Sequence, residues 1–270
     1  MSAQKDVRRL TLSHFHKMRE QDEKIVMLTS YDASFAQISE AAGVEILLIG
    51  DSLGMVCQGH DSTLPVTMDQ TEYHTRMVAR GSTRALVIAD MPFGSYQESP
   101  PQALRNAARL MAAGAQMVKL EGGRVMHDTV RFLVDRGIPV CGHVGLTPQS
   151  VNQLGGYKVQ GKTDAGARQV LEDAELLQAA GASLIVLEAI PALLAKRITE
   201  ALAIPTIGIG AGVDCSGQVL VVYDMLEIYP GRKARFVKNY LAGASSIQAA
   251  IENYVKEVKA KKFPAPEHAF

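Results

Sequence analysis

Four acidic residues each end a short apolar run of the chain, where an acidic side chain is well placed to do chemistry. The runs ILLIGD, ALVIAD, MVKLE and LIVLE end at Asp51, Asp90, Glu121 and Glu188. A short continuous apolar run is typical of a buried parallel strand, and a carboxylate at its carboxyl end lies at a mouth lined by loops. Four carboxylates at one mouth repel one another unless a cation, protons or cationic side chains offset their charge. The pattern therefore indicates a metal site or an acid–base site.

Three other polar residues stand close to strand ends. Ser52 follows Asp51 directly, Lys119 stands two residues before Glu121, and His143 follows the sequence PVCG. Each also has a structural explanation: an acid or Ser52 could cap a helix, Lys119 could pair with a carboxylate, and His143 could be a hydrogen-bonded core residue. Their joint placement favours a functional site. Hard carboxylate oxygens without clustered His and Cys residues favour Mg2+ over Zn2+.

The elements that must position these residues alternate along the chain. Apolar runs predict eight strands near residues 24–30, 45–50, 84–90, 116–121, 138–143, 183–188, 204–209 and 218–224. Helix ends are marked by three Ala-Ala-Gly triplets, at residues 41–43, 112–114 and 179–181. Helix starts are marked by capping-box pairs, Thr67 with Gln70 and Ser99 with Gln102.

Eight strand–helix units in 270 residues favour an α/β fold, a closed (β/α)8 TIM barrel, over an open doubly wound sheet. We expect residues 1–270 to form one domain, with the barrel proper at about 24–242. The segment before residue 24 and a charged helix at about 245–262 are expected to be short helical extensions. Catalytic groups of such barrels lie at the carboxyl ends of the strands, where the four acids are expected.

Two glycine-rich stretches resemble ligand-binding motifs. Residues 156–163, GYKVQGKT, match the phosphate-loop pattern, but a polar loop precedes them instead of a buried strand, so we do not predict nucleotide binding. The surrounding loop, residues 146–162, is long enough to be a lid or a binding loop. The turn GIGAG at 208–212 could bind an anion or be a tight barrel turn. It is not a dinucleotide fingerprint, because Val213 replaces the last glycine.

Composition excludes several classes of protein. Lys plus Arg and Asp plus Glu both number 28, so no net basic field attracts nucleic acid or an anionic membrane. The apolar stretches are far shorter than the ~18 residues that span a bilayer, and the start MSAQKDVRRL lacks a secretory signal. Cys57, Cys141 and Cys215 form no CxxC pair. We expect a cytoplasmic protein without disulfides.

Several blocks of the sequence resemble the ketopantoate hydroxymethyltransferase family: LIGDSLGMVCQGHDSTLPVT, ADMPFGSY, VKLEGG, CGHVGLTPQSVNQLGGYKVQG, VLEAIP and PTIGIGAG. Their order and spacing follow the family's from about Lys24 to the closing PAPEHAF, and the first 20 residues carry little of the resemblance. The resemblance implies a Mg2+-dependent (β/α)8 enzyme that transfers a one-carbon unit from 5,10-methylenetetrahydrofolate to 3-methyl-2-oxobutanoate. The product is ketopantoate, a pantothenate precursor. It also implies a homo-oligomer, a decamer of two pentameric rings.

The resemblance further implies roles for the acids. Asp51 and Asp90 would be direct ligands of one Mg2+ per subunit, and Glu121 would be a ligand through water. Glu188 would be the catalytic base. These roles fit the chemistry, because a cation bound by the keto acid stabilises the negative charge that develops when the base removes the C3 proton.

The substrate-binding residues implied by the resemblance are Asp51, Ser52, Asp90, Lys119 and His143. Ser52 and Lys119 would hold the substrate carboxylate. His143 would line the site and form a hydrogen bond to the substrate or the folate.

Two other functions are compatible with the pattern of acids. A 2-oxo acid lyase or mutase of the phosphoenolpyruvate mutase and isocitrate lyase type would use similar carboxylates and Mg2+. Those lyases carry a cysteine in a loop that we cannot locate in this sequence. A binding barrel without catalytic activity would keep the pocket but lose the base, and Glu188 argues against it.

Overall fold

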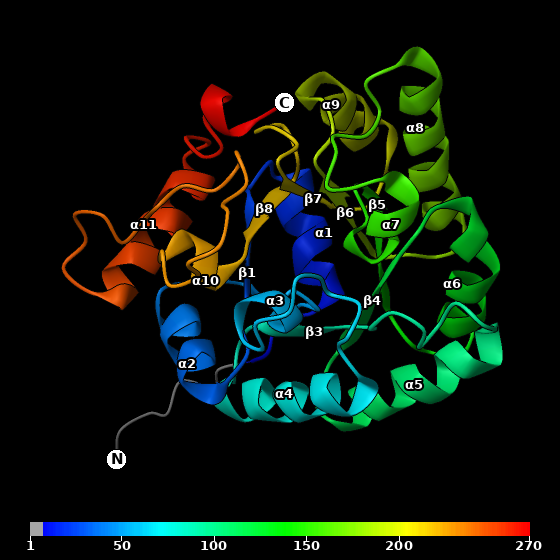
Figure 1. The fold of residues 1–270 in the computed structure, drawn as a ribbon, viewed down its shortest axis with the longest axis horizontal. Helices are drawn as coiled ribbons and strands as arrows, with labels where there is room; N and C mark the ends of the chain where they lie inside the picture. Colours follow the sequence, from blue (N-terminus) through cyan, green and yellow to red (C-terminus); the bar gives the residue numbers. More distant parts are fainter. Residues whose placement is uncertain (1–7) are drawn as a thin grey trace.

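Eight parallel strands close into one barrel in chain order within residues 8–270, the part of the chain that the computed structural model describes (Figure 1). The strands are β1 (Ile25–Thr29), β2 (Ile46–Ile49), β3 (Leu86–Asp90), β4 (Met117–Glu121), β5 (Val140–Gly145), β6 (Leu184–Glu188), β7 (Thr206–Ile209) and β8 (Gly217–Leu220). Each overlaps the run expected from the sequence, so the predicted (β/α)8 barrel is confirmed. Residues 1–7 of the polar start lie outside the described residues.

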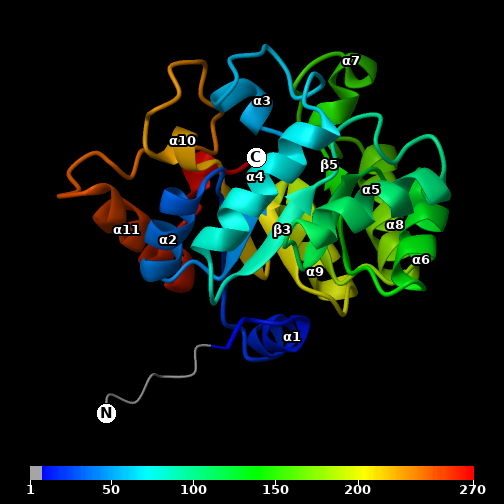
Figure 2. The ribbon, with the colours of Figure 1, turned by 90° about the horizontal axis from the view of Figure 1, so that it is seen from below.

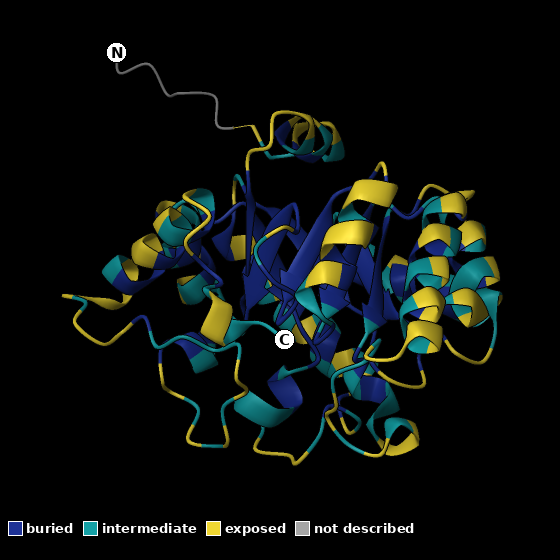
Figure 3. Cartoon of the chain, turned by 90° about the horizontal axis from the view of Figure 1, so that it is seen from above, coloured by how far each residue is buried: buried dark blue, intermediate teal, exposed yellow. Residues whose placement is uncertain are grey.

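Helices surround the barrel, and they expose their outer faces while the strands are buried (Figure 3). The longer outer helices are α2 (Ala33–Ala41), α4 (Met68–Gly81), α5 (Pro100–Ala112), α6 (His127–Val134), α8 (Asp164–Ala179), α9 (Ala192–Ala201) and α11 (Ile247–Lys259). Short helical turns are α3 (Leu53–Val56), α7 (Val151–Leu154), α10 (Val222–Met225), η1 (Arg124–Met126), η2 (Pro148–Ser150) and η3 (Pro266–His268). Within residues 8–270, none of the helices has the length and apolar character required to cross a membrane.

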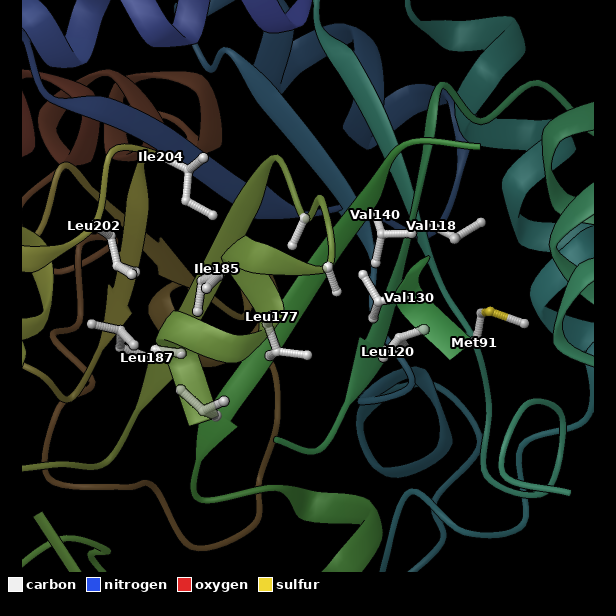
Figure 4. Packing of buried hydrophobic residues seen from close by; sticks show 14 of the residues in the cluster. Met91, Val118, Leu120, Val130, Val140, Leu177, Ile185, Leu187, Leu202 and Ile204 are labelled. Atoms are coloured by element: carbon white, nitrogen blue, oxygen red, sulfur yellow. The ribbon is translucent and has the colours of Figure 1, made fainter. Parts of the chain in front are cut away.

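In β4, the alternation of side chains directs two polar residues into the barrel. Successive strand residues point to opposite faces. In β4, Val118 and Leu120 belong to an apolar cluster shared with Val130 of α6, outside the barrel (Figure 4). Lys119 and Glu121, which alternate with them, therefore face the inside. Packing of the outer residues against the helices fixes the direction of the inner ones.

Helix α1 (Leu12–Glu20) closes one end of the barrel. Figure 2 shows this helix below the strands, on the side away from α3 and α7. Its Phe15 and Met18 pack into the inner core, whose strand residues are Ile25, Met27, Ile46, Leu48, Leu86, Ile88, Met117, Cys141, Leu184, Val186, Ile207, Ile209 and Val219. The N-terminal extension thus caps the amino ends of the strands and leaves the carboxyl ends open to the loops.

Most of the predicted helix boundaries agree with the structure. The glycines of the three Ala-Ala-Gly triplets all have positive φ angles, which L side chains rarely adopt: +99° at Gly43, +114° at Gly114 and +100° at Gly181. Thr67 and Gln70 form the predicted capping box. Ser99 accepts a hydrogen bond from the Gln102 backbone N–H, but the Gln102 side chain accepts from Glu98 N–H, one residue earlier than expected.

The last strand is shorter than predicted. The apolar run at 218–224 was expected to be a strand throughout, but β8 ends at Leu220 and α10 follows. The backbone N–H of Val222 donates to Thr29 Oγ1 at 2.9 Å, and Val222 and Met225 are buried in an outer apolar cluster. An apolar run of this length fits a buried helical turn as well as a strand.

The C-terminal extension seals the seam where the barrel closes. Helix α11 lies within the range predicted at 245–262 and packs beside β1. The Tyr254 hydroxyl lies 3.0 Å from the Met27 carbonyl of β1 and 3.1 Å from the Gln218 carbonyl of β8. Both strands at the seam are therefore linked to the same helix.

The carboxylate of Glu40, at the end of α2, organises the loop that leads into β3. It accepts hydrogen bonds from the backbone N–H groups of Thr83, Arg84 and Ala85 at 2.9–3.1 Å and from the Ser82 hydroxyl at 2.7 Å. Burial alone would raise the pKa of Glu40, but these hydrogen bonds outweigh it and lower the pKa to about 2. The ionised side chain therefore stabilises the entry to the strand that carries Asp90.

We expect Glu40→Gln to lower the free energy of unfolding by about 2 kcal/mol near neutral pH, because hydrogen bonds to a charged group are replaced by weaker ones. The native pKa is depressed, so the contribution is complete above the unfolded pKa of about 4.3 and is lost as the pH falls toward 2. Urea unfolding at several pH values measures this difference, with the exposed Glu20→Gln of α1 as control. Equal midpoints for Glu40→Gln and the parent near neutral pH would contradict the prediction.

Candidate active site

The strand register brings four of the predicted residues together inside the carboxyl end of the barrel. Asp90 of β3 is the register partner of Lys119 in β4, and Glu121 of β4 is the partner of His143 in β5. Lys119 and Glu121 are two residues apart and share the inner face. All four residues are at most 5% exposed. The site thus follows from strand pairing and from the alternation of side chains.

Asp51 and Ser52 join this group from the turn after β2. The backbone N–H of Asp51 donates to Asp90 Oδ2 at 3.3 Å, so the two acids are neighbours. Ser52 Oγ and the Tyr31 hydroxyl share a hydrogen bond of 2.8 Å. Ser52 occupies the N-cap position of α3 but makes no capping hydrogen bond through its side chain.

Lys119 is held by the acids around it. Its Nζ lies 2.7 and 2.6 Å from the two carboxylate oxygens of Asp90 and 3.8 Å from Glu121 Oε1. Burial alone would lower the pKa of Lys119, but Asp90, Glu121 and Asp51 outweigh it and raise the pKa. The ammonium is therefore charged, and its contact with Asp90 agrees both with simple pairing and with a role in binding.

Carboxyl groups outnumber cationic groups at this place. Burial, followed by the repulsion of Asp90 and Glu121, raises the pKa of Asp51 to about 8. Burial also raises the pKa of Asp90. The Lys119 ammonium and the His143 imidazole, whose pKa is also raised, are two cationic groups among four carboxyl groups, those of Asp51, Asp90, Glu121 and Glu188. A bound cation would relieve this repulsion and favour the ionised forms.

His143 lies between two of the acids. Its Nδ1 is 3.4 Å from Glu121 Oε1, and its Nε2 is 3.2 Å from Glu188 Oε2. Burial and Lys119 lower the pKa of His143, but the two carboxylates outweigh them and raise it to about 9. Within residues 8–270, neither imidazole nitrogen has an aligned hydrogen-bond partner, and the same is true of Glu121 Oε1. Buried polar atoms without a hydrogen-bond partner are rare in native proteins and are a feature of catalytic and ion-binding sites.

The position of Glu188 depends on a glycine in the neighbouring strand. Gly145 of β5 is the register partner of Glu188 of β6 and has a φ of +94°. A Cβ atom at Gly145 would lie 2.3 Å from the Glu188 carbonyl oxygen. The absence of a side chain therefore allows the two strand ends to approach. The Glu188 side chain is 14% exposed and reaches the cavity described below.

Helix capping does not explain the four acids. In the described part of the chain, the helices and turns that follow their strands have N-cap residues Ser52, Ser99, Gly123 and Pro191. The four acids therefore do not serve as helix caps, and they line the mouth of the barrel.

Gln149 and Tyr96 are part of the site but were not predicted from the sequence. Gln149 lies in η2 and is 5% exposed. Its Nε2 donates to Asp51 Oδ2 at 3.0 Å, and its backbone N–H donates to Glu121 Oε2 at 2.9 Å. The Tyr96 hydroxyl donates to Gln149 Oε1 at 2.6 Å. Neither residue follows a strand directly and neither is acidic or basic, so the pattern of strand-ending acids did not include them.

A cavity of about 580 Å³ opens above the acids. Asp51, Asp90, Lys119, Glu121, His143 and Glu188 line its inner end. Tyr157 and Val159 of the loop at 146–162 form part of one wall, and residues 229–236 with the C-terminal Phe270 form another. The basic side chains Arg232, Lys233 and Arg235 belong to this second wall. The volume is typical of sites for small organic ligands.

The two glycine-rich stretches have structural roles here. The phosphate-loop match at 156–163 follows α7 instead of a strand, and its Thr163 caps α8 by accepting from Gly166 N–H. In the GIGAG turn, a Cβ at Gly210 would lie 2.6 Å from the Phe236 ring, and Gly210 has a φ of +62°. This close packing favours the tight-turn interpretation over the anion site.

The acids fit a magnesium site of the kind completed by substrate and water. Among the described residues, no three His, Cys, Asp or Glu side chains form a group that could hold a metal ion by themselves. Mg2+ is often bound through one or two carboxylates, with the other positions filled by water and substrate oxygens. The adjacent Asp51 and Asp90, the excess of carboxyl groups and a Glu121 Oε1 without an aligned hydrogen-bond partner among the described residues agree with such a site.

The fold alone is shared with enzymes that act on other acids. A phosphoenolpyruvate phosphomutase from Streptomyces platensis subsp. rosaceus superposes with a TM-score of 0.60 over 93% of this chain and 88% of that one. The two sequences are 14% identical. This similarity agrees with the barrel but does not distinguish the transferase from the mutase type.

Sequence similarity makes that distinction. A 3-methyl-2-oxobutanoate hydroxymethyltransferase from Nitrosospira multiformis is 62% identical over 97% of this chain and 100% of the relative. One from Thiobacillus denitrificans is 64% identical over 97% of this chain and 99% of the relative. The sequence model described as ketopantoate hydroxymethyltransferase matches residues 9–266. The chain belongs to the ketopantoate hydroxymethyltransferase family.

Proposed function

We propose that this enzyme transfers a hydroxymethyl group from 5,10-methylenetetrahydrofolate to 3-methyl-2-oxobutanoate, giving 2-dehydropantoate (ketopantoate) for pantothenate biosynthesis. The observation that carries the proposal is the cluster of Asp51, Asp90 and Lys119 beside the His143–Glu188 pair, all at the inner end of one cavity. The names of the similar enzymes support the same activity.

Asp51 and Asp90 are proposed as direct ligands of one Mg2+ per subunit, with Glu121 as a ligand through water. When bound, Mg2+ supplies Lewis-acid stabilisation of the negative charge that develops on the substrate's keto oxygen. The charge balance supports this assignment, because burial and the repulsion of Asp90 and Glu121 raise the pKa of Asp51, and burial raises the pKa of Asp90.

Lys119 and Ser52 are proposed to hold the substrate carboxylate. An ammonium has three N–H donors, and Asp90 accepts from Lys119 through its two oxygens, so a donor is left for the substrate. Ser52 lies next to Asp51 in the chain and is among the residues that line the cavity. Together they would orient the 2-oxo acid with its C3 carbon toward Glu188.

Glu188 is proposed as the base that removes the C3 proton. The imidazole of His143 lies 3.2 Å from its carboxylate and would orient it, and His143 would also form a hydrogen bond to the substrate or the folate. Water cleaves the two C–N bonds of the folate methylene, so that tetrahydrofolate leaves with the protons of water and the one-carbon unit keeps the oxygen as a carbonyl. The C3 carbon bonds to this carbonyl carbon, and the oxygen takes up the proton removed from C3 and becomes the product hydroxyl. The folate would occupy the cavity between the acids and the wall at 229–236.

The lyase or mutase alternative has less support. None of the three cysteines is among the residues that line the cavity. Incubation with 3-methyl-2-oxobutanoate, 5,10-methylenetetrahydrofolate and Mg2+ separates the functions, because only the transferase releases ketopantoate and tetrahydrofolate. A binding barrel would release neither.

We expect Glu188→Gln to lower kcat by about 10²- to 10⁴-fold, because the amide cannot accept the proton. The variant should also lose the exchange of the substrate's C3 proton with D2O in the absence of folate, as followed by NMR. Glu175→Gln, an exposed change in α8, is the matched control. Full turnover and full exchange in Glu188→Gln would eliminate Glu188 as the base.

Removal of divalent ions with EDTA should abolish ketopantoate formation, and added Mg2+ should restore it. Asp51→Asn should weaken Mg2+ binding by at least about 10²-fold, because a neutral amide replaces a charged ligand. Calorimetric titration of the metal-free protein measures the Kd, and Asp135→Asn on the exposed surface is the control. Unchanged Mg2+ affinity in Asp51→Asn would count against the ligand assignment.

We also propose that the enzyme acts in the cytoplasm as a homodecamer of two pentameric rings. Light scattering on the purified protein should give a mass of about ten chains. A monomer at micromolar concentration would contradict the assembly without affecting the assignment of the site.

A further inference from the structure

Gln149 links two of the proposed metal ligands to the loop that lines the cavity. Its side-chain Nε2 lies 3.0 Å from Asp51 Oδ2 and 3.0 Å from the Met91 carbonyl oxygen. Its backbone N–H donates to Glu121 Oε2 at 2.9 Å. One residue of the loop at 146–162 therefore contacts both an acid after β2 and an acid at the end of β4.

The orientation of the Gln149 amide is determined by its surroundings. Tyr96 Oη accepts a hydrogen bond from Glu121 N–H at 3.1 Å, which leaves its own proton for Gln149 Oε1 at 2.6 Å. Gln97 Nε2 donates to the same Oε1 at 3.2 Å. Both N–H bonds of Gln149 are thereby directed at acceptors, Asp51 and the Met91 carbonyl. The reversed amide would place its oxygen against these two acceptors and is disfavoured.

The hydrogen bonds of Gln149 leave one oxygen of each acid available. Asp51 uses Oδ2 and Glu121 uses Oε2 in these contacts, whereas Glu121 Oε1 is buried without an aligned partner in the described part of the chain. Mg2+ requires a nearly ideal octahedral arrangement of oxygens. Groups that orient metal ligands by hydrogen bonds therefore contribute to metal affinity, typically by about 10- to 100-fold.

We propose that Gln149 is a positioning residue that aims Asp51 and Glu121 at the divalent cation, so that the loop at 146–162 forms part of the metal site. The inference rests on the proposed function for the presence of the cation. It assigns Gln149 no contact with the reacting atoms. If Gln149 only satisfied buried hydrogen-bonding groups, its replacement would lower stability and leave the Mg2+ affinity unchanged.

The test compares Mg2+ affinity with stability in the full-length protein. Gln149→Met keeps a similar volume and the backbone N–H but removes the amide. Gln153→Met, an exposed change of the same kind in the same loop, lies outside the residues that line the cavity and is the matched control. Calorimetric titration of metal-free protein with MgCl2 gives the Kd, and urea unfolding in EDTA gives the stability of the same samples.

The Kd for Mg2+ should rise by about 10- to 100-fold in Gln149→Met and stay within about twofold in Gln153→Met. Raising the Mg2+ concentration should restore much of the ketopantoate formation in Gln149→Met. An unchanged Kd with reduced stability in EDTA would overturn the proposal and leave a structural role. If Gln149→Met does not fold, Gln149→Asn, which keeps an amide on a shorter side chain, gives the same comparison.

The failure of this inference can be distinguished from failure of the proposed function. A parent protein that binds Mg2+ but forms no ketopantoate would disprove the function while the Kd comparison still decides the role of Gln149. A parent protein that binds no Mg2+ would overturn both the metal assignment and the inference. Equal Kd values for the parent and for both Gln149 variants would overturn the inference alone.

Discussion

The burial of several carboxylates around one ammonium is the constraint on which the rest of the site depends. Asp51, Asp90 and Glu121 are each at most 5% exposed, and Lys119 is in contact with Asp90. Like charges in a low-dielectric interior repel strongly unless they are compensated. The packed barrel holds them together because the apolar residues that alternate with them, such as Val118, anchor the strands to the outer helices. The packing that stabilises the barrel therefore also holds the acids where a cation can bind.

The two extensions of the barrel make this arrangement possible at one end only. Helix α1 inserts Phe15 and Met18 below the inner core, and α11 links β1 and β8 through Tyr254. The opposite end contains the cavity, which residues of the loops at 146–162 and 229–236 line. Polar residues at the carboxyl ends of the strands do not interrupt the inner apolar core, because that core lies beneath them.

The comparison with the phosphomutase shows why the fold does not determine the reaction. That structure shares the barrel at 14% identity, and folds of this kind carry many chemistries. Sequence similarity, and not the fold, places this chain in its family. His143 between Glu121 and Glu188 places a cationic imidazole against the carboxylate proposed as the base, and no cysteine lines the cavity within residues 8–270.

The sequence by itself determined the eight strands, most helix ends and the identity of the acids, because apolar periodicity and glycine stops are local properties of the chain. The strand predicted at 218–224 was too long, because an apolar run of this kind suits a buried helical turn equally well. Only the tertiary structure decided which side chains meet. The pairing of Asp90 with Lys119 follows from strand register, and the contacts of Gln149 arise where its loop folds back onto Asp51 and Glu121. Such contacts between distant segments leave no periodic signal in the sequence, because they depend on barrel closure and on the path of the loops.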